Sequence, residues 1–422
     1  MVLRSILLFA AVACSSVATT ASAQPASAER RADASHRRSL SGVGAGSGGH
    51  DGRFFLQSQD RSDRFELRGE SQFRYYSVFG LDDDGGERGG EDEAFGNGFE
   101  HTRHRLDFSG HAMDTRLKYR VRGDFARSGG AFTLVDANAS YDLGDGWRLR
   151  WGQYKIAYDR EFSQIGGASG LAVERSLAST IFRLNRSQGV ELRYQTDDWR
   201  VSGTFHDGRR AANTSFFSSS EADIALTGRL EAKLGEAGWR QFGDATSFRE
   251  AKTGVLLGLG GHWQQDGRDL RAGDASGTTN LIQYTADVSI EGDGWNLMAV
   301  WFGRVIDSPS PSQSDTLHEF AFNVQGGYFL CDHAELFARY EHIFPDDDRP
   351  ERDDDFPSVA LGANWYFVPA SHAAKLTGQV IWYPEAQADS ASVVSAPNSN
   401  VGLAPDDSGG QVAMVWQFQL LF

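Results

Sequence analysis

The chain has 422 residues and a formal net charge of −16, from 57 acidic and 41 basic side chains. Its 28 Phe, 12 Tyr and 10 Trp are too many for a disordered chain, and its two cysteines exclude a disulfide scaffold. The acidic balance argues against nucleic-acid binding, and no apolar run reaches the length of about 18 residues that a membrane-spanning helix needs.

The first 23 residues have the pattern of a secretory signal peptide. Arg4 supplies a positive charge, residues 6–13 form a short apolar stretch, and Ala21-Ser22-Ala23 offers a small-x-small cleavage site. The mature chain is therefore predicted to begin near Gln24. Lipidation of Cys14 is the alternative interpretation, which is disfavoured because the apolar stretch ahead of this cysteine is short.

Two kinds of sequence follow the signal. Residues 24–63 contain a long stretch of Ser, Gly, Ala and Arg without an apolar period, which predicts a flexible N-terminal segment. From residue 64 the dominant pattern has a period of two, as where Leu117, Tyr119 and Val121 alternate with cationic side chains. The one stretch with a helical pattern is 160–182. The alternating segments predict about sixteen strands, at 64–79, 100–112, 115–127, 131–142, 147–155, 187–196, 199–207, 221–233, 251–265, 280–291, 294–306, 317–329, 333–344, 355–368, 373–385 and 409–422.

The connections between these strands alternate in length. Short joints lie at 113–114, 144–146, 196–198, 292–294 and near 331–332, and long loops lie at 80–99, 156–186, 208–220, 266–279, 307–316, 345–354 and 386–408. Two connections depart from this scheme, because 234–250 is long and 128–130 is short. An even number of antiparallel strands with short turns at one end and long loops at the other predicts an all-β fold, a transmembrane β-barrel over 64–422.

The last strand separates this fold from a soluble β-sandwich. Its apolar face alternates without a break from Val412 to Phe422. A final amphipathic strand that ends in Phe is similar to the signal read by the bacterial barrel-assembly machinery. Trp and Tyr near the strand ends suit an interfacial girdle, although they would also serve as core residues. The sequence therefore predicts a protein of the outer membrane of a Gram-negative-type bacterium, in contact with lipid.

Residues 101–192 resemble the phosphate-selective porin O and P family. The resemblance rests on an ordered set of short motifs, among them Thr102-Arg103-His104-Arg105-Leu106, Trp151-Gly152-Gln153-Tyr154-Lys155, Glu174-Arg175-Ser176 and Arg186-Ser187-Gln188-Gly189-Val190. It implies a sixteen-stranded, usually trimeric porin that passes small anions such as phosphate. It also implies a constriction loop folded into the lumen and cationic side chains along the pore.

The candidate pore-lining residues are cations on the face opposite the outward apolar set. They are Arg103, Arg105, Arg116, Lys118, Arg120, Arg122, Arg148 and Arg150. On a barrel that face lines the lumen, where guanidinium groups would bind oxyanions and enrich anions locally. The alternative is a wall in which these cations pair with carboxylates on the same face. Such a wall would be electrostatically flat and only mildly selective. The carboxylates concerned are Asp107, Asp124, Asp136 and Glu191.

The long loop 156–186 is the candidate constriction, with an ordinary external loop as the alternative. Its candidate cations are Lys155, Arg160, Arg175 and Arg183, opposed by Asp159, Glu161 and Glu174. The Glu174-Arg175 pair is expected to hold the loop against the barrel wall rather than to contact solute.

Most of the negative charge lies in two loops. Seven acidic residues fall in 80–99 and seven in 345–356, and both loops are predicted at the long-loop end. A surface receptor or adhesin that acts through these loops is therefore one alternative, and a general diffusion porin is another. The sequence has no G-x-S-x-G, H-E-x-x-H or P-loop motif and no histidines at metal-ligand spacing, so no enzyme, metal or cofactor is expected. The preferred prediction is an anion-conducting porin. Its expected partners are small anions and two further copies of the chain.

Overall fold

The computed structural model describes residues 47–50, 53–80, 95–125, 127, 129–216, 218, 221–266, 279–307, 316–349, 354–391, 393–405 and 409–422. The predicted signal peptide and much of the predicted flexible segment lie outside these ranges, and so do residues 81–94 and 350–353 of the two acidic loops.

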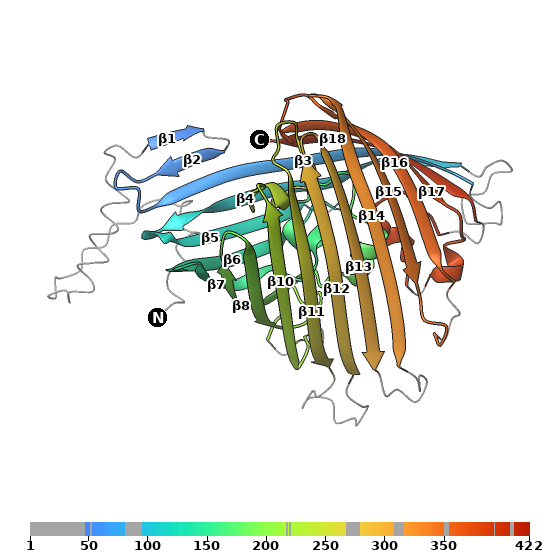
Figure 1. Ribbon diagram of the computed structural model, residues 1–422, viewed down its shortest axis with the longest axis horizontal. Coiled ribbons are helices and arrows are strands. Elements are labelled where there is room, and N and C mark those ends of the chain that lie inside the picture. Colours follow the sequence, from blue (N-terminus) through green and yellow to red (C-terminus); the bar gives the residue numbers. More distant parts are fainter. Residues whose placement is uncertain are drawn as a thin grey trace. The chain divides into compact units, whose positions relative to one another are not determined.

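Sixteen long strands form a closed antiparallel barrel (Figure 1). In chain order they are β3 (Arg64–Phe79), β4 (Phe95–Ala112), β5 (Asp114–Phe125), β6 (Phe132–Gly144), β7 (Trp147–Lys155), β8 (Arg186–Gln195), β9 (Trp199–His206), β10 (Ile224–Gly235), β11 (Gly254–Asp266), β12 (Thr279–Gly292), β13 (Trp295–Asp307), β14 (Leu317–Cys331), β15 (Ala334–Phe344), β16 (Phe356–Tyr366), β17 (Ala374–Tyr383) and β18 (Gln411–Leu421). Each pairs with the next, and β18 closes the ring on β3 with Leu421 opposite Glu70. The predicted barrel is confirmed. The largest difference in a strand boundary is at β4, which begins at Phe95 rather than at residue 100.

Two short strands precede the barrel. Strand β1 (Ser47–His50) pairs with β2 (Phe54–Gln57), and β2 pairs with residues 64–67 of β3. The described end of the segment predicted to be flexible therefore contains strand structure. The physical reason is that β18 covers β3 only from Glu70 onward. The first backbone groups of β3 thus remain open to another strand.

The two faces of each strand meet different surroundings. In β18, the side chains of Met414, Trp416 and Phe418 point outward and are exposed, whereas Ala413 and Val415 point inward and are buried. Because the ring is closed, the backbone N–H and C=O groups of each barrel strand form hydrogen bonds with both neighbouring strands. Such pairing is required within a membrane, where no water can replace it. The alternation read from the sequence therefore separates an outward apolar surface from a lumen.

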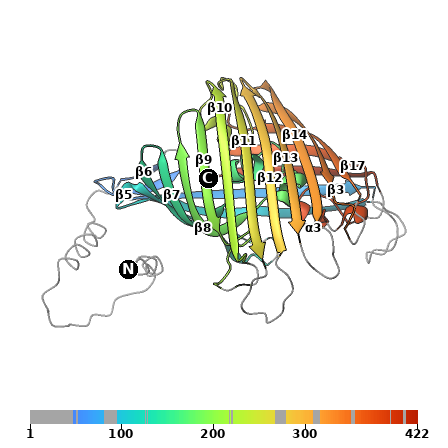
Figure 2. The ribbon, with the colours of Figure 1, turned by 60° about the horizontal axis from the view of Figure 1, so that its bottom comes forward.

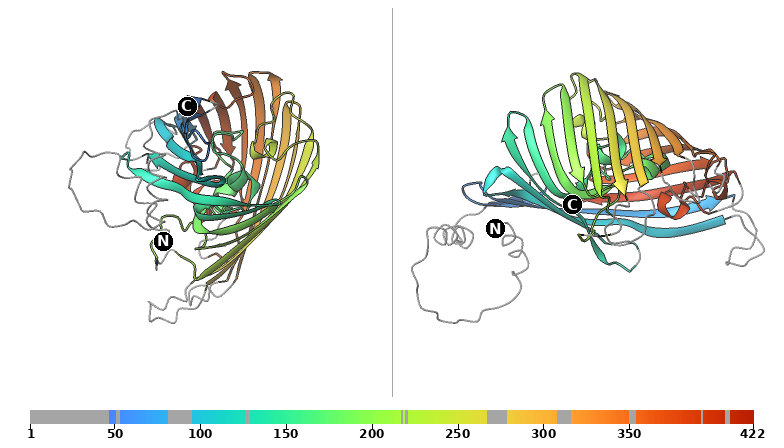
Figure 3. Two further views of the ribbon diagram at one scale, coloured as in Figure 1. Left: turned by 90° about the vertical axis from the view of Figure 1, so that its left-hand side faces the viewer. Right: turned by 90° about the horizontal axis from the view of Figure 1, so that it is seen from below.

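The connection between β7 and β8 runs inside the barrel, as predicted (Figure 2 and Figure 3). It contains a π-helical turn, η2 (Arg160–Gln164), and a short helix, α2 (Leu177–Phe182), which packs against β13, β14 and β15. The Ser176 hydroxyl accepts a hydrogen bond from the backbone N–H of Ser179 and so caps α2. Within the described ranges, no helix is long and apolar enough to cross a membrane.

The unusually long connection between β10 and β11 is explained by a second inward fold. It contains the 3₁₀ turn η3 (Gln241–Gly243), and its Ala245 N–H donates to the Ser169 carbonyl at 3.1 Å. Its Ser247 hydroxyl donates to the Gly292 carbonyl at 2.6 Å. This connection therefore contacts the β7–β8 loop from the end of the barrel that carries the short turns. The β17–β18 connection, with η4 (Ala388–Ser390) and α3 (Ala396–Ser399), lies at the long-loop end.

Candidate functional site

The cations of the barrel wall are mostly paired with carboxylates. Of the eight cations predicted to line the pore, six have a carboxylate partner. The pairs are Arg103 with Glu174, Arg105 with Asp124, Arg116 with Asp114, Arg120 and Arg122 with Asp107, and Arg150 with Glu191. Lys118 and Arg148 form no ion pair with another described residue. The wall between β4 and β8 therefore carries its cations largely as ion pairs, the arrangement in which a wall is only mildly selective.

The β7–β8 loop is held in the lumen by buried carboxylates. Glu174 accepts hydrogen bonds from Arg103 and, at 3.3 Å, from Arg74, which joins the loop to β3 and β4. Glu161 accepts from the Ser176 N–H at 2.9 Å and from Asn323 of β14 at 2.8 Å. These contacts attach the loop to two separate parts of the barrel wall, β3 with β4 and β14, so that it forms a fixed partition in the lumen.

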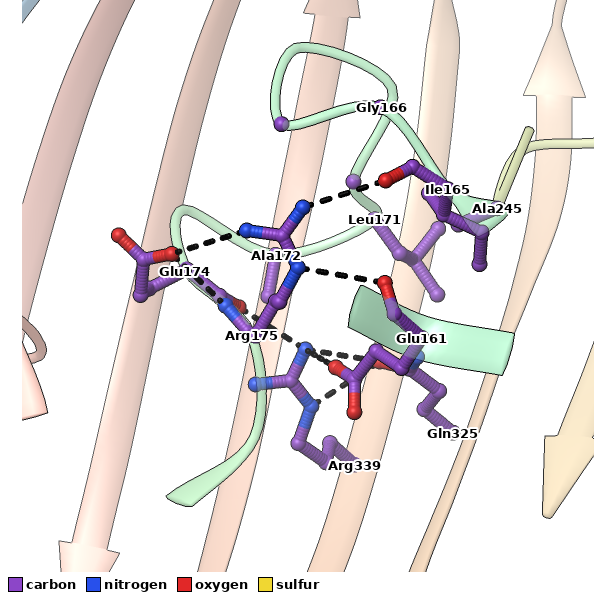
Figure 4. Close-up of a pocket in the computed structure, with 12 residues that line it drawn as sticks. Glu161, Ile165, Gly166, Leu171, Ala172, Glu174, Arg175, Ala245, Gln325 and Arg339 are labelled. Atoms are coloured by element: carbon purple, nitrogen blue, oxygen red, sulfur yellow. Dashed lines mark hydrogen bonds and ion pairs between the residues drawn. The ribbon is translucent and has the colours of Figure 1, made fainter. Parts of the chain in front are cut away.

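Arg175 lies at the centre of this partition (Figure 4). Its guanidinium donates to the carbonyls of Glu161 and Ile165, each at 3.2 Å, and lies 3.8 Å from the Glu174 carboxylate. Arg339 of β15 donates from below to the Glu174 carbonyl at 3.0 Å. The cavity among these side chains holds only about 20 Å³, so this part of the loop is closed to solute.

One phenyl ring gathers four cations at the edge of the partition. Around Phe162 lie Lys155 at 4.8 Å, Arg175 at 4.7 Å, Arg183 at 4.8 Å and Arg186 at 5.9 Å, measured from each charged group to the ring centroid. We call these four residues the cation cluster. An aromatic face attracts cations, which offsets part of the repulsion among them.

The cation cluster has fewer carboxylates than cations. Arg186 donates to Asp136 at 2.7 Å, but Asp136 also lies 3.8 Å from Arg122. Lys155 donates only to the backbone carbonyls of Phe162 and Ile165, at 2.8 and 3.1 Å. No described carboxylate forms an ion pair with Arg183.

Two guanidinium groups of the cluster, those of Arg175 and Arg183, remain charged at neutral pH. Burial lowers the pKa of Arg175 to about 10 and that of Arg183 to about 9, and both values leave the guanidinium protonated. The cluster therefore keeps an excess of positive charge in a partly dehydrated place, where a charge acts more strongly than it does in water.

Arg160 does not join the other three predicted constriction cations. Its guanidinium donates to Glu291 of β12 at 3.0 Å and to the Phe242 carbonyl of the β10–β11 connection. Its side chain is almost fully buried. The structure thus brings Lys155, Arg175 and Arg183 together and places Arg160 on the opposite side of the loop, as a tie to the barrel wall.

A cavity of about 280 Å³ lies on the side of the partition nearer the short turns, and we call it the turn-side cavity. It is lined by seven cationic and four acidic side chains, a formal excess of three positive charges. They are Arg68, Arg120, Arg122, Arg150, Lys155, Arg193 and Arg200, with Glu70, Asp136, Glu191 and Glu231.

A second cavity of about 240 Å³ lies toward the long loops, and we call it the loop-side cavity. Its charged lining residues are Arg209, Arg210, Arg304 and Arg349. Since Lys155 lines the turn-side cavity and Arg209 donates to the Arg183 carbonyl, the cation cluster lies between the two.

Several of these residues were missed in the sequence. Arg186 belongs to a motif that carried the family resemblance, yet it was not counted as a site residue. Phe162 follows two charged residues in a loop, where no periodicity indicates the direction of a side chain. Arg209 and Arg210 lie in the β9–β10 connection. Two consecutive arginines in a loop at the barrel mouth are the sequence feature that could have identified them as site residues.

A closed sixteen-stranded barrel with a long loop packed across its lumen defines an outer-membrane porin. The chain belongs to the phosphate-selective porin O and P family, whose family model matches residues 73–393. It is therefore a channel protein of the Gram-negative outer membrane. Among curated proteins, none matches the chain in sequence.

Solved porin structures share this fold at low sequence identity. The anion-selective porin from Comamonas acidovorans is 12% identical with a TM-score of 0.57, and the match covers 85% of this chain and 100% of that one. OmpT of Vibrio cholerae is 11% identical with a TM-score of 0.53, covering 86% and 98%. The outer-membrane channel DcaP of Acinetobacter baumannii is 13% identical with a TM-score of 0.51, covering 86% and 99%.

Proposed function

We propose that this porin passes small anions by passive diffusion, phosphate-like oxyanions among them, and that the cation cluster selects them. The observation that carries the proposal is the convergence of Lys155, Arg175, Arg183 and Arg186 on Phe162 with fewer carboxylates than cations. Membership of a phosphate-selective family agrees with it.

An anion can reach the cation cluster from either cavity, because the cluster lies between the two. An anion that enters the loop-side cavity meets four arginines, and the turn-side cavity beyond the cluster again has an excess of positive charge. Positive potential between low-dielectric walls raises the local concentration of anions. Conduction also requires that an ion leave easily, which several weak sites in series allow better than one deep site.

The paired wall favours a general diffusion porin as the second candidate. Arg150, for example, lies 2.6 Å from Glu191, so that this one-to-one pair adds little net field. In a general porin the mild field of the wall would govern permeation, and the cation cluster would serve only to hold the loop.

The zero-current potential in a potassium chloride gradient distinguishes the two candidates. With the refolded protein in a planar bilayer, we expect a potential of the sign that indicates chloride preference, because the excess charge at the narrowest part is positive. Inorganic phosphate added to the same bilayer is expected to reduce the chloride conductance. A channel that prefers potassium, or shows no preference, would contradict the proposal.

We also propose that the porin forms a homotrimer through the outward face of β4 to β6. On this face a ring nitrogen of His104 lies 2.6 Å from a ring nitrogen of His101, within hydrogen-bond distance. Two small residues, Ala137 and Ala139, lie on the same face, on strand β6. Imidazoles are costly against lipid, and small side chains let neighbouring protein approach closely. The outward faces of β10 to β13 carry large aliphatic side chains instead, which suit lipid.

A bulky side chain on this face is expected to prevent assembly. Ala139→Trp should convert a trimer that migrates as such on unheated detergent gels into a monomer, because the new indole fills the space of the neighbouring subunit. Ala286→Trp is the matched control, since Ala286 is exposed on the outward face of β12. Loss of the trimer in both variants, or in neither, would argue against this interface.

Three proposals concern export, domain organisation and assembly. We propose that residues 1–23 direct secretion, that 24–63 is an N-terminal segment before the barrel domain 64–422, and that the assembly machinery reads the strand ending at Phe422. In support of the last, Phe422 exchanges backbone hydrogen bonds with Gly69 at the seam of the barrel. The strand that the assembly machinery recognises would then be the strand that closes the barrel.

A further inference from the structure

The loop-side cavity has both a cationic and an aliphatic lining, and an inorganic anion would use only the cationic one. Four arginine side chains face it from the β9–β10 connection, from β13 and from the β15–β16 loop. The remaining lining is mainly aliphatic, from Leu177 and Ile181 of α2, from Ile306 of β13 and from Val393 and Val394 of the β17–β18 loop. The cationic and apolar surfaces thus enclose one space of about 240 Å³.

Among the described residues, one carboxylate forms ion pairs with arginines of this cavity. Arg304 and Arg349 bind the same carboxylate, that of Glu319, which is fully buried. Arg210 donates to the Thr180 carbonyl at 3.1 Å, Arg209 donates to the Ile181 carbonyl, and neither forms an ion pair with a described residue. Arg209 and Arg210 therefore give the cavity an excess of positive charge, which attracts an anion.

The aliphatic lining adds a second requirement. A hydrated inorganic ion gains nothing from contact with Ile181 or Val394, whereas a hydrocarbon or aromatic group gains free energy in proportion to the apolar area that it removes from water. An ion with a charged group at one end and an apolar body at the other would use both surfaces at once. Pockets for organic ligands commonly have this composition, an apolar lining with a few fixed polar groups.

We propose that the loop-side cavity binds small organic anions that carry an apolar body, such as aromatic or short aliphatic carboxylates, before they reach the cation cluster. This proposal rests on the anion-conducting function proposed above and adds a substrate class to it. The carboxylate would be held by the arginine side chains, and the apolar body would lie against α2 and the β17–β18 loop.

The test compares benzoate with acetate as blockers of chloride current through the refolded porin in a planar bilayer. The two anions have the same charge and differ in the apolar body. We expect benzoate to halve the current at a concentration at least tenfold below that of acetate, because only benzoate uses the aliphatic lining. Equal half-blocking concentrations in a chloride-preferring channel would overturn this inference and leave the proposed function intact.

Two polar variants localise the effect. Ile181→Thr and Val394→Thr place a hydroxyl in the cavity and should reduce the tenfold difference to about threefold or less. Leu403→Thr is the matched control, a buried aliphatic residue of the same β17–β18 loop that does not line the cavity. A difference that persists in both cavity variants would place benzoate elsewhere and refute the inference.

A charge variant separates the two proposals further. Arg210→Gln should raise the half-blocking concentrations of benzoate and acetate together, since it weakens attraction for any carboxylate. If Arg210→Gln changes neither concentration, the arginines of the cavity do not hold the anion and the inference fails. A wild-type channel that prefers potassium would refute the anion-conducting function itself, whatever benzoate does.

Discussion

Replacing Lys155 and Arg183 together by glutamine is expected to remove most of the chloride preference of the channel. Both cations lie within 5 Å of the Phe162 ring centroid, and neither has an ion pair with a described carboxylate. At an effective dielectric constant of 20, two unit charges about 4 Å apart interact by roughly 4 kcal/mol, and salt reduces this where water enters. We therefore expect the ratio of chloride to potassium permeability to fall at least about tenfold, which is about 1.4 kcal/mol.

Two further variants show whether the charge at this place is the cause. Arg116→Gln removes the same charge from a residue that is 55% exposed at the short-turn end and bound to Asp114, so we expect little change in the permeability ratio. Arg183→Lys keeps the charge and should keep most of the preference. If the double variant retains the ratio, or if Arg116→Gln lowers it as much, selectivity does not originate in the cation cluster.

The barrel could be predicted from the sequence because its determinants are local. The alternation of apolar and polar side chains indicates which face of a strand meets lipid. The alternation of short and long connections indicates at which end of the barrel each connection lies. The last strand, from Val412 to Phe422, shows both properties clearly. The same reasoning placed Arg120 and Arg122 on the inward face, where the structure has them beside Asp107.

Ion pairing across strands depends on register, which alternation alone does not give. The ladder between β3 and β4 shifts at Gln72, and the ladder between β5 and β6 shifts after Arg122. A shift of one residue exchanges the two faces of a strand from that point onward. The sequence therefore left both a free cationic wall and a paired wall open, although it named the carboxylates with which the arginines pair.

The β7–β8 loop shows a stronger limit of sequence reasoning. Arg160 and Arg175 look equivalent in the sequence, since both are arginines next to a glutamate. In the structure Arg160 binds Glu291 on the β12 wall, whereas Arg175 contacts Phe162 at the cation cluster. A loop has no repeating geometry, and its side-chain directions follow from long-range contacts with several strands.

Glu174→Gln is expected to loosen the constriction loop and to increase the conductance of the channel. Burial raises the pKa of Glu174, but the charges of Arg103 and Arg74 lower it more, so the carboxylate is ionised at neutral pH. Glutamine keeps one acceptor oxygen, replaces the other with an NH2 donor and removes the charge, which takes the shared counter-charge from Arg74, Arg103 and Arg175. Breaking a buried ion pair in this way costs about 3–5 kcal/mol. We expect a lower unfolding midpoint in urea and a larger, noisier single-channel conductance.

The matched control is Glu100→Gln, the same substitution in the outer half of β4. Glu100 pairs with Arg127 at 3.3 Å, and both side chains are about one-third exposed, at 32% and 34%. Exposed pairs contribute about 0–1 kcal/mol, so we expect neither property to change measurably. If Glu174→Gln lowers stability but leaves the conductance unchanged, the partition is held by the other contacts of the loop, above all those of Glu161 with Ser176 and Asn323. The loop would then remain in place without its link to β3 and β4, and the width of the passage would be set from the β14 side.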